Sequence, residues 1–286
     1  MNAFKTGGKP LEIRFDLSSS SSDGGLLVLQ KANERLGLTK RMASQLTEFR
    51  KGEPVHSLEK MLAQRVYGIC LGWEDCNDFD SLMEDPLYRL ALGGKPASQP
   101  VLSRFENGVR MKDLYRLSLE LVNLFVERHR EKAPKRLVID MDATDDPAHG
   151  QQEFEFYHGY YGKHCFLPLL VFVSADSEDE ELVGAVLRPG NVHAGRRSAG
   201  VLRRLVQMLQ AAFPKAEILF RGDAGFALPE MYDTCEALRI SYLISLPKND
   251  RLLEMAAPLR DKAKRERDES QEKVRLFGEL SYAAGS

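Results

Sequence analysis

The sequence lacks the features of a membrane-bound or secreted protein. Among its 286 residues no apolar run is long enough to cross a bilayer, and residues 1–15 lack the apolar core of a signal peptide. The few cysteines lack the spacing of a zinc site and sit among apolar or mixed neighbours, like small core residues: Cys70, Cys76, Cys165 and Cys235. We therefore expect reduced thiols, a cytoplasmic location and no membrane partner.

An excess of charge of either sign is also missing. The formal net charge is −2 and the isoelectric point is near 6.3. These values argue against a protein whose whole surface wraps nucleic acid, because such affinity comes from neutralising phosphates. Lysine and arginine still cluster locally, at residues 40–41, 132–136, 196–197 and 203–204. Most such clusters are solvated helix faces, but a local basic surface stays possible.

The first half of the chain has mostly helical patterns. Residues up to about Phe15 are polar or irregular, and the serine run 18–22 has the composition of a loop. We expect Gly37 to end the first helix, and Thr39 and Ser57 to cap the second and third. Helical spacing of apolar residues predicts helices over residues 26–36, 39–46, 58–71, 87–92, 99–107 and 111–130.

One short helix has a polar side of interest. After Ser98, the run VLSRFEN carries Ser103, Arg104 and Asn107 on that side. Several short helices with exposed Ser, Arg and Asn can form a helix-turn-helix reader of DNA. A plain helical bundle is the more common outcome of this pattern, so the sequence leaves both open.

After the basic linker 131–136 the pattern changes to strands. Strand-like runs and helices then alternate with turns marked by Gly, Pro and Asp, and they predict a mixed sheet with an antiparallel meander on one side and parallel crossovers on the other. The strands are expected at residues 137–142, 166–174, 181–188, 217–222 and 240–246, and the helices at 198–213 and 229–238. A charged helix over 251–272 and a strand-like run, VRLFGELSY, follow, and the chain looks cut after them.

Acidic residues gather at the end of the first of these strands, in LVIDMDATDD. The period of a strand places Asp140 and Asp142 on one face, while Asp145 and Asp146 suit a turn before Pro147. Such a cluster is stable if it is solvated or if a divalent cation neutralises it. The stretch alone leaves a solvated strand end and a metal site as alternatives.

A second acid, Asp223, ends the strand EILFRG in the sequence RGDAGF. Ligands gather at the carboxyl ends of parallel strands, so Asp142 and Asp223 meet if the first and fourth strands are neighbours. An aspartate that opens a turn is the alternative for Asp223. The strand order with acids on the first and fourth strands is the plan of the RNase H-like fold, in which paired carboxylates hold two Mg²⁺ ions for phosphodiester chemistry.

Several long stretches resemble one known family. They are RFDLSSSSSDGGLLVLQKANERLGL, HSLEKMLAQRVYGICLGWEDCNDFDSLMEDP, SQPVLSRFEN, IDMDATDDPAHGQQEFEFYHGYYGKHCFLPL, LRPGNVHA, RGDAGFA and LPKNDRL. With them the chain resembles bacterial insertion-sequence transposases of the DDE type, in the group of insertion sequence 1380 within the clan related to insertion sequence 4.

The resemblance implies an activity and a site. Asp142 and Asp223 are the implied catalytic acids and metal ligands, with Mg²⁺ as cofactor and Mn²⁺ as a substitute, and Asp140 lies deeper in the strand. The implied reaction nicks DNA at the terminal inverted repeats and joins the freed 3′-hydroxyl to target DNA. The family's third acid, a glutamate on a later helix, has no match here, so a chain truncated at its carboxyl end is expected.

The resemblance also implies a division of the chain and its partners. Residues 1–130 are expected to form an all-α region that binds DNA ends and supports a homo-oligomer. Residues 131–249 would form the α/β RNase H-like core with an incomplete mixed sheet, and residues 250–286 would begin an inserted segment. Predicted DNA contacts, each with a structural role as the alternative, are Arg104, Asn107, Arg188 and Lys248.

Other functions stay open at this point. A chain without the third acid would be a catalytically inactive remnant that binds transposon-end DNA. An unrelated metal-dependent hydrolase would use the histidines near Asp142, which are His149, His158 and His164. Three tyrosines stack on bases or pack as the aromatic face of a strand: Tyr157, Tyr160 and Tyr161.

Overall fold

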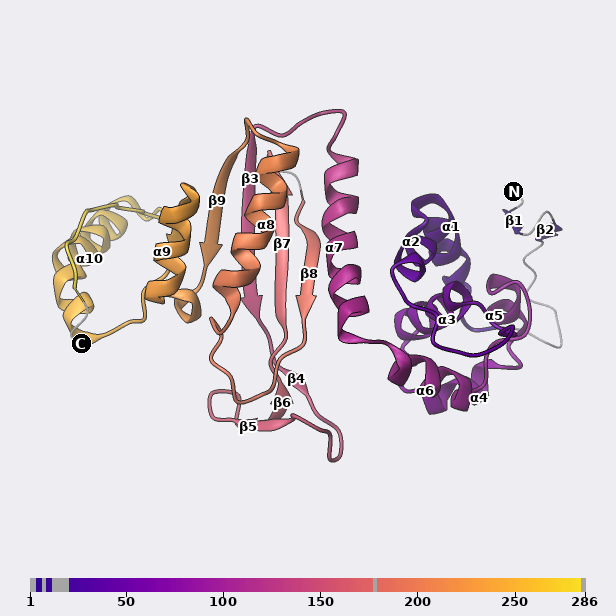
Figure 1. Cartoon of the computed structure of the whole chain (residues 1–286). Helices are drawn as coiled ribbons and strands as arrows, with labels where there is room; N and C mark the ends of the chain where they lie inside the picture. Colours follow the sequence, from indigo (N-terminus) through magenta and orange to yellow (C-terminus); the bar gives the residue numbers. More distant parts are fainter. Residues whose placement is uncertain (1–3, 7–8, 12–20, 177–178, 284–286) are drawn as a thin grey trace. The chain divides into compact units, whose positions relative to one another are not determined.

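The computed structural model describes residues 4–6, 9–11, 21–176 and 179–283. The chain divides into two compact units, a helical unit over Met1–Arg128 and a sheet unit over His129–Ser286 (Figure 1). The sequence had placed this boundary after residue 130, and the third segment that it placed from residue 250 stays a prediction. Most of the serine run 18–22 lies outside the described residues.

The helical unit follows the predicted helices closely. Gly37 ends α1 with a φ of 63°, a conformation that glycine adopts without steric cost, and the Ser57 side chain accepts a hydrogen bond from the Lys60 amide at the start of α3. The helices are α1 Leu26–Leu36, α2 Leu38–Ser44, α3 Leu58–Cys70, α4 Phe79–Leu82, α5 Pro86–Ala91, α6 Gln99–Gly108 and α7 Met111–Arg128, with a 3₁₀ turn, η1, at Cys76–Asp78.

Three predictions in this unit were wrong in detail. Thr39 lies inside α2 and is buried, and it accepts a hydrogen bond from Asn33 instead of capping the helix. The irregular start contains a two-stranded antiparallel pair, β1 Phe4–Thr6 and β2 Lys9–Leu11, so the region is not all-α. The acidic segment after Trp73 contains more helix than expected, because Asp75 and Asp85 cap η1 and α5 with their side chains.

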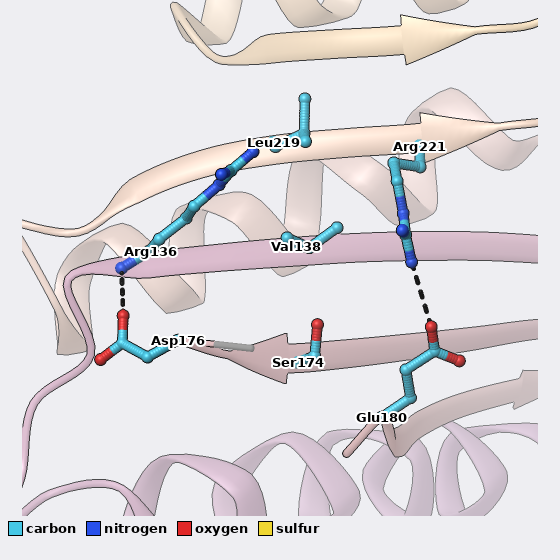
Figure 2. Close-up of a pocket in the computed structure, with 7 residues that line it drawn as sticks. All are labelled: Arg136, Val138, Ser174, Asp176, Glu180, Leu219 and Arg221. Atoms are coloured by element: carbon cyan, nitrogen blue, oxygen red, sulfur yellow. Dashed lines mark hydrogen bonds and ion pairs between the residues drawn. The ribbon is translucent and has the colours of Figure 1, made fainter. Parts of the chain in front are cut away.

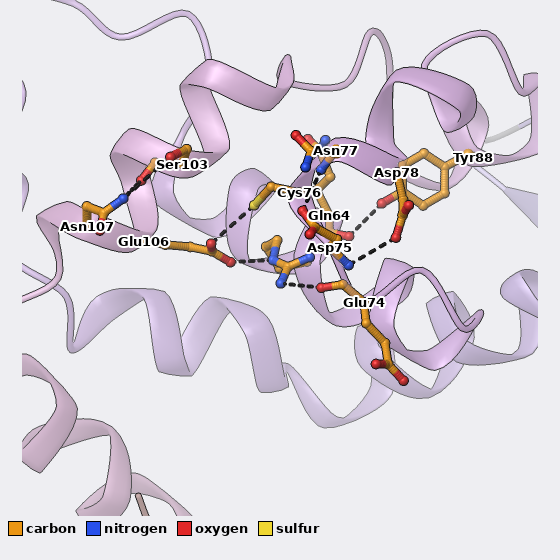
Figure 3. Close-up of polar contacts among 11 residues, drawn as sticks. Gln64, Glu74, Asp75, Cys76, Asn77, Asp78, Tyr88, Ser103, Glu106 and Asn107 are labelled. Atoms are coloured by element: carbon orange, nitrogen blue, oxygen red, sulfur yellow. Dashed lines mark hydrogen bonds and ion pairs between the residues drawn. The ribbon is translucent and has the colours of Figure 1, made fainter. Parts of the chain in front are cut away.

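A single apolar cluster holds the helical unit together. Met61, Phe79 and Leu102 are each fully buried in it, which is the main source of stability for short helices. Buried polar contacts cross the cluster: the Gln64 side chain exchanges two hydrogen bonds of 2.8 Å with the backbone of Ala97, and the Tyr88 hydroxyl donates to the Gln64 carbonyl. Figure 3 shows Gln64 and Tyr88 together with Asp75, the residue that caps η1.

The sheet unit is built on five strands in the order β10-β9-β3-β7-β8. β7 is antiparallel to β3 and β8, whereas β3, β9 and β10 are parallel. This is the RNase H-like arrangement predicted from the sequence, because the first and fourth core strands are neighbours. The strands are β3 Arg136–Ala143, β7 Leu169–Ala175, β8 Glu181–Val186, β9 Glu217–Gly222 and β10 Ser241–Ile244.

The two faces of β3 differ in character. Leu137, Ile139 and Met141 are at most 4% exposed and form the buried face of the strand. α8 (Ser198–Ala212) runs across the sheet, and α9 (Pro229–Leu238) lies beside β9 (Figure 1). The alternate residues of β3, among them Asp140 and Asp142, are half-buried or exposed. The period of two therefore sorts this strand into a core face and a polar face.

A smaller three-stranded sheet follows β3 in the chain. Its order is β4-β6-β5, with bounds β4 Asp146–Pro147, β5 Phe156–His158 and β6 Lys163–Phe166. The predicted strand over 166–174 was therefore wrong at its start, because the chain leaves one sheet and enters the other at Pro168. Proline has no N–H to donate to a ladder, so a break at this position costs no hydrogen bond.

The last described segment is a helix followed by an extended stretch. α10 (Asp250–Ser270) begins at Asn249, whose side chain accepts from the Leu252 amide. The predicted strand over 274–282 was wrong, since the described residues there pair with no strand and lie along α10, where Tyr282 accepts from Asn249 at 2.9 Å. A strand needs a partner to bond its backbone groups. Over the described residues, no helix has the length and apolar character to span a membrane.

Candidate functional site

Asp142 and Asp223 lie at the carboxyl ends of neighbouring parallel strands, with Asp142 the next-to-last residue of β3 and Asp223 directly after β9. Met141 of β3 pairs in register with Gly222 of β9, so each aspartate is the next residue along its strand direction. Both side chains are exposed, and both line one pocket at this end of the sheet. The structure therefore brings together the two acids that the sequence had paired.

Asp223 is fixed by its own turn. It is the N-cap residue of the 3₁₀ turn η2 (Ala224–Phe226), and its Oδ1 accepts from the Gly225 amide at 2.8 Å. Asp223 thus opens a turn and also lines the pocket. The sequence had raised the turn and the ligand site as alternatives, and the two do not exclude one another.

The small residues around Asp223 serve packing. A side chain at Gly225 would meet the Ala194 Cβ at 2.7 Å, and one at Gly222 would meet Phe226 at 3.1 Å. The space above this turn is therefore occupied by the loop before α8. Because Gly225 has no side chain, the turn after Asp223 packs closely against the loop before α8.

Asp140 is held by an arginine that sequence reasoning missed. Arg221 of β9 donates from Nε and Nη2 to the two carboxylate oxygens of Asp140, at 2.7 Å each, and Nη2 also reaches Glu180 at 3.0 Å. Figure 2 shows Arg221 directed toward Glu180 across the strands. The hydrogen bond to Asp140 is the main cause that raises the pKa of Arg221. The available signal was the strand period, which places Arg221 on the face of Asp223.

Asp145 and Asp146 lie beyond the pocket lining. Asp145 forms an ion pair of 2.6 Å with Lys163, and the hydrogen bond from Lys163 lowers the pKa of Asp145. Asp146 is exposed at the start of β4. Tyr161 donates its hydroxyl to the carbonyl of Ala143, next to Asp142, at 3.3 Å. Burial is the main cause that raises the pKa of Tyr161, and the negative charges nearby add to it.

The histidines near Asp142 do not form a metal site. His164 pairs with Glu155 at 2.9 Å, His158 packs its ring against Tyr161 at 4.9 Å between centroids, and His149 is exposed. No group of three His, Cys, Asp or Glu side chains in the described part of the chain is placed to hold a metal ion. The alternative of a zinc hydrolase therefore has no support in the structure.

The two exposed acids do suit a hard cation of another kind. Mg²⁺ commonly binds through one or two carboxylates and fills its remaining positions with water and substrate phosphate. Asp142 and Asp223 offer such carboxylates on one open pocket, with Ser245 also lining it. The donor set therefore fits Mg²⁺ or Mn²⁺ better than it fits zinc.

Arg188 has a structural role. It is 6% exposed, and its guanidinium donates to the backbone carbonyls of Leu167, Ala194 and Arg196. Burial lowers the pKa of Arg188. The guanidinium links Leu167, between β6 and β7, to the loop before α8. The phosphate contact at Arg188 stays a prediction beside this structural role.

The other predicted DNA contacts lie on the surface. Lys248 is exposed between β10 and α10, in the sheet unit. Arg104 and Asn107 are exposed one helical turn apart on α6, in the helical unit, and Asn107 donates to the Ser103 carbonyl at 2.8 Å. Figure 3 shows Asn107 turned toward Ser103 at the end of that helix. A phosphate contact stays a prediction for these three residues.

Three solved structures are similar to this chain in fold. A piggyBac transposase synaptic complex with hairpin DNA is 13% identical in sequence. The alignment covers 78% of this chain and 52% of that one, with a TM-score of 0.40. The Drosophila P element transposase strand transfer complex is 10% identical; the alignment covers 82% of this chain and 50% of that one, with a TM-score of 0.35. The catalytic domain of Mos1 mariner transposase is 13% identical, with coverages of 59% and 77% and a TM-score of 0.27. The chain thus spans about half the length of the first two.

The sequence comparisons give one match. No curated protein matches the chain. The family model described as transposase DDE domain group 1 matches residues 4–286, which includes both strands that carry the paired acids. The chain therefore belongs to the family of the transposase DDE domain, group 1.

Proposed function

We propose that this chain acts in the transposition of an insertion sequence of the insertion sequence 1380 group. In this proposal Asp142 and Asp223 are the catalytic acids and bind Mg²⁺, for which Mn²⁺ can substitute. The observation that carries the proposal is the parallel register of β3 and β9, which places the two exposed aspartates on one pocket. Family membership supplies the type of reaction, which is DNA strand cleavage followed by transesterification to target DNA.

The residues of the chain would hold and orient the reacting groups. Asp142 and Asp223 supply oxygen ligands from two rigid strand ends, and the turn at Gly225 fixes the orientation of Asp223. A bound divalent cation lowers the pKa of an attacking water or 3′-hydroxyl and stabilises the leaving oxygen. Exposure of both acids leaves room for a phosphodiester to reach them, as the reaction requires.

Full activity would require a third carboxylate in addition to these two. Within the described residues no third His, Cys, Asp or Glu joins Asp142 and Asp223. The helical unit would bind the terminal inverted repeats through surface residues such as Arg104, and two or more copies would assemble on DNA. Lys248 would contact a phosphate near the acids.

The test combines metal binding with strand cleavage. Mn²⁺ binding by paramagnetic resonance is expected to weaken by roughly tenfold or more in Asp142→Asn and Asp223→Asn, since each removes a charge next to the cation. Asp146→Asn is the matched control, because Asp146 is also exposed but lies outside the pocket lining. The same variants are then compared for cleavage of DNA that carries the element ends, in Mg²⁺ or Mn²⁺. Unchanged binding and cleavage in both variants would sink the proposal.

A second candidate is a protein that binds transposon ends without cleaving them. Within the described residues, no third His, Cys, Asp or Glu is placed to hold a metal ion together with Asp142 and Asp223, and this favours the second candidate. In this case the chain binds end-containing DNA in a shift assay, and no cleavage appears with either metal. Cleavage that depends on Asp142 rules this candidate out.

A further inference from the structure

We infer that Arg221 is a positioning residue that withholds Asp140 from the metal and limits the negative charge of the pocket. This inference rests on the proposed metal binding by Asp142 and Asp223. Without Arg221, a cation would meet a second aspartate on the same strand face. The role of Arg221 concerns which carboxylates are available to bind a cation, and it is separate from the identity of the catalytic acids.

The geometry matches this role. Asp140 and Arg221 are register partners on the parallel strands β3 and β9. The Arg221 Nε donates to Oδ1 of Asp140 and the Nη2 donates to Oδ2, at 2.7 Å each. Such a fork fixes the plane of the carboxylate and satisfies both of its oxygens. Two residues further along the same face of the two strands come Asp142 and Asp223. The Asp140–Arg221 pair is therefore neutral, whereas Asp142 and Asp223 both keep their negative charge.

Among the described residues that line the pocket, one cationic side chain faces several acids. Four carboxylates line it, from Asp140, Asp142, Glu180 and Asp223, together with the single guanidinium of Arg221. Arg221 bonds Glu180 at 3.0 Å as well as Asp140. Arg221 thus compensates Asp140 and Glu180 and leaves Asp142 and Asp223 to a ligand.

A purely structural role predicts a different outcome from this one. The Arg221 side chain is 44% exposed and that of Asp140 is 22% exposed, and ion pairs with such exposure contribute little to stability. If Arg221 governs charge in the pocket, its loss increases cation affinity, because the pocket becomes more acidic and Asp140 becomes free to bind. If it only supports the fold, its loss leaves affinity unchanged or weakens it.

The experiment measures Mn²⁺ binding to the full chain by paramagnetic resonance. Arg221→Met is expected to bind Mn²⁺ roughly tenfold more tightly than wild type, the size expected for one added net charge near the cation. Asp140→Asn is expected to bind several-fold more weakly, since Arg221 then has less charge to compensate. The double variant, Arg221→Met with Asp140→Asn, is expected to return close to wild type.

The outcomes separate the two proposals. Affinity in Arg221→Met that equals wild type or falls below it, with unchanged thermal unfolding, overturns the role of Arg221 while the proposed function stands. Failure of Asp140→Asn to reverse the gain in the double variant overturns it too. If wild type binds no Mn²⁺, or if Asp142→Asn leaves binding intact, the proposed function fails and this inference fails with it.

Discussion

Polar side chains are held in two different ways in the two units of this chain. In the helical unit, Gln64 is fully buried and both ends of its amide bond to the backbone of Ala97. In the sheet unit, Arg221 and Asp140 form an equally well-directed pair that stays partly open to water. The first arrangement joins segments that are distant in sequence, and the second controls the charge beside an open pocket.

The difference follows from the surroundings of each pair. A buried amide that loses its partner has no water to replace it, so the full desolvation cost appears as lost stability. A half-exposed ion pair exchanges its partner for water and salt at little cost. The comparison therefore predicts that changes at the buried contacts reduce stability, while changes at the exposed pair alter binding.

The largest effect is expected for Gln64→Ala. It removes two hydrogen bonds of 2.8 Å and leaves the backbone N–H and C=O of Ala97 without them. We expect the free energy of unfolding of the helical unit to fall by about 2–5 kcal/mol. Trp73 is the only tryptophan in the sequence and packs against the core of this unit, so its fluorescence during urea denaturation measures the change.

Gln210→Ala is the matched control for that loss. Gln210 is exposed on α8, and its amide makes one hydrogen bond of 3.3 Å to the Leu238 carbonyl. We expect a change within about 0.5 kcal/mol, as for most surface substitutions. An effect as large as that of Gln64→Ala, measured by circular dichroism, would contradict the role given to burial.

A smaller effect is expected for Tyr88→Phe. The Tyr88 hydroxyl is buried and donates to the Gln64 carbonyl at 2.5 Å. The phenyl ring keeps the packing, so only the hydrogen bond is lost, at a cost of about 0.5–1.5 kcal/mol. Denaturation followed by Trp73 fluorescence measures it. A loss as large as that of Gln64→Ala would show that the hydroxyl supports more than one contact.

A still smaller effect on stability is expected for Asp140→Asn in the sheet unit. The variant keeps the shape of the side chain and removes its charge, so the free energy of unfolding should fall by less than about 1 kcal/mol. The loss should shrink further at high salt, which screens exposed pairs. Circular dichroism during urea denaturation at two salt concentrations tests this. A fall in the free energy of unfolding of more than about 1 kcal/mol at high salt would show that the Asp140–Arg221 pair stabilises the fold as a buried contact does.

The smallest effect concerns acid pH and Asp176. The carboxylate of Asp176 accepts from the backbone amides of Lys135 and Arg136, and the bond from Arg136 is the main cause that lowers the pKa of Asp176 from its ordinary 3.8. Because the pKa is lowered in the folded state, the stabilisation is complete above pH 3.8 and is lost as the pH falls through the folded value. In Asp176→Asn the urea midpoint of the sheet unit should depend less on pH below this value. An identical pH dependence in both proteins would contradict the assignment.

Much of the fold could be predicted because local rules agree with it. α1, α9 and β9 have the predicted bounds, since a glycine cap, a proline start and a short apolar alternation mark them in sequence. Thr39 and the stretch 274–282 could not be predicted in this way. The environment of Thr39 is set by Asn33 and Tyr67 from other helices, and the stretch 274–282 has strand-like composition without a strand to pair with.

Asp142 and Asp223 show how much of the site could be predicted from the sequence. The sequence by itself determined that Asp142 and Asp223 each lie at the carboxyl end of a strand, because the alternation before them is local. Only the tertiary structure decided that these strands are parallel neighbours, that Arg221 neutralises Asp140, and that Arg188 turns inward to bond three carbonyls. Register and burial join residues far apart in the chain, and no local pattern encodes which charged side chain will find its partner across a sheet.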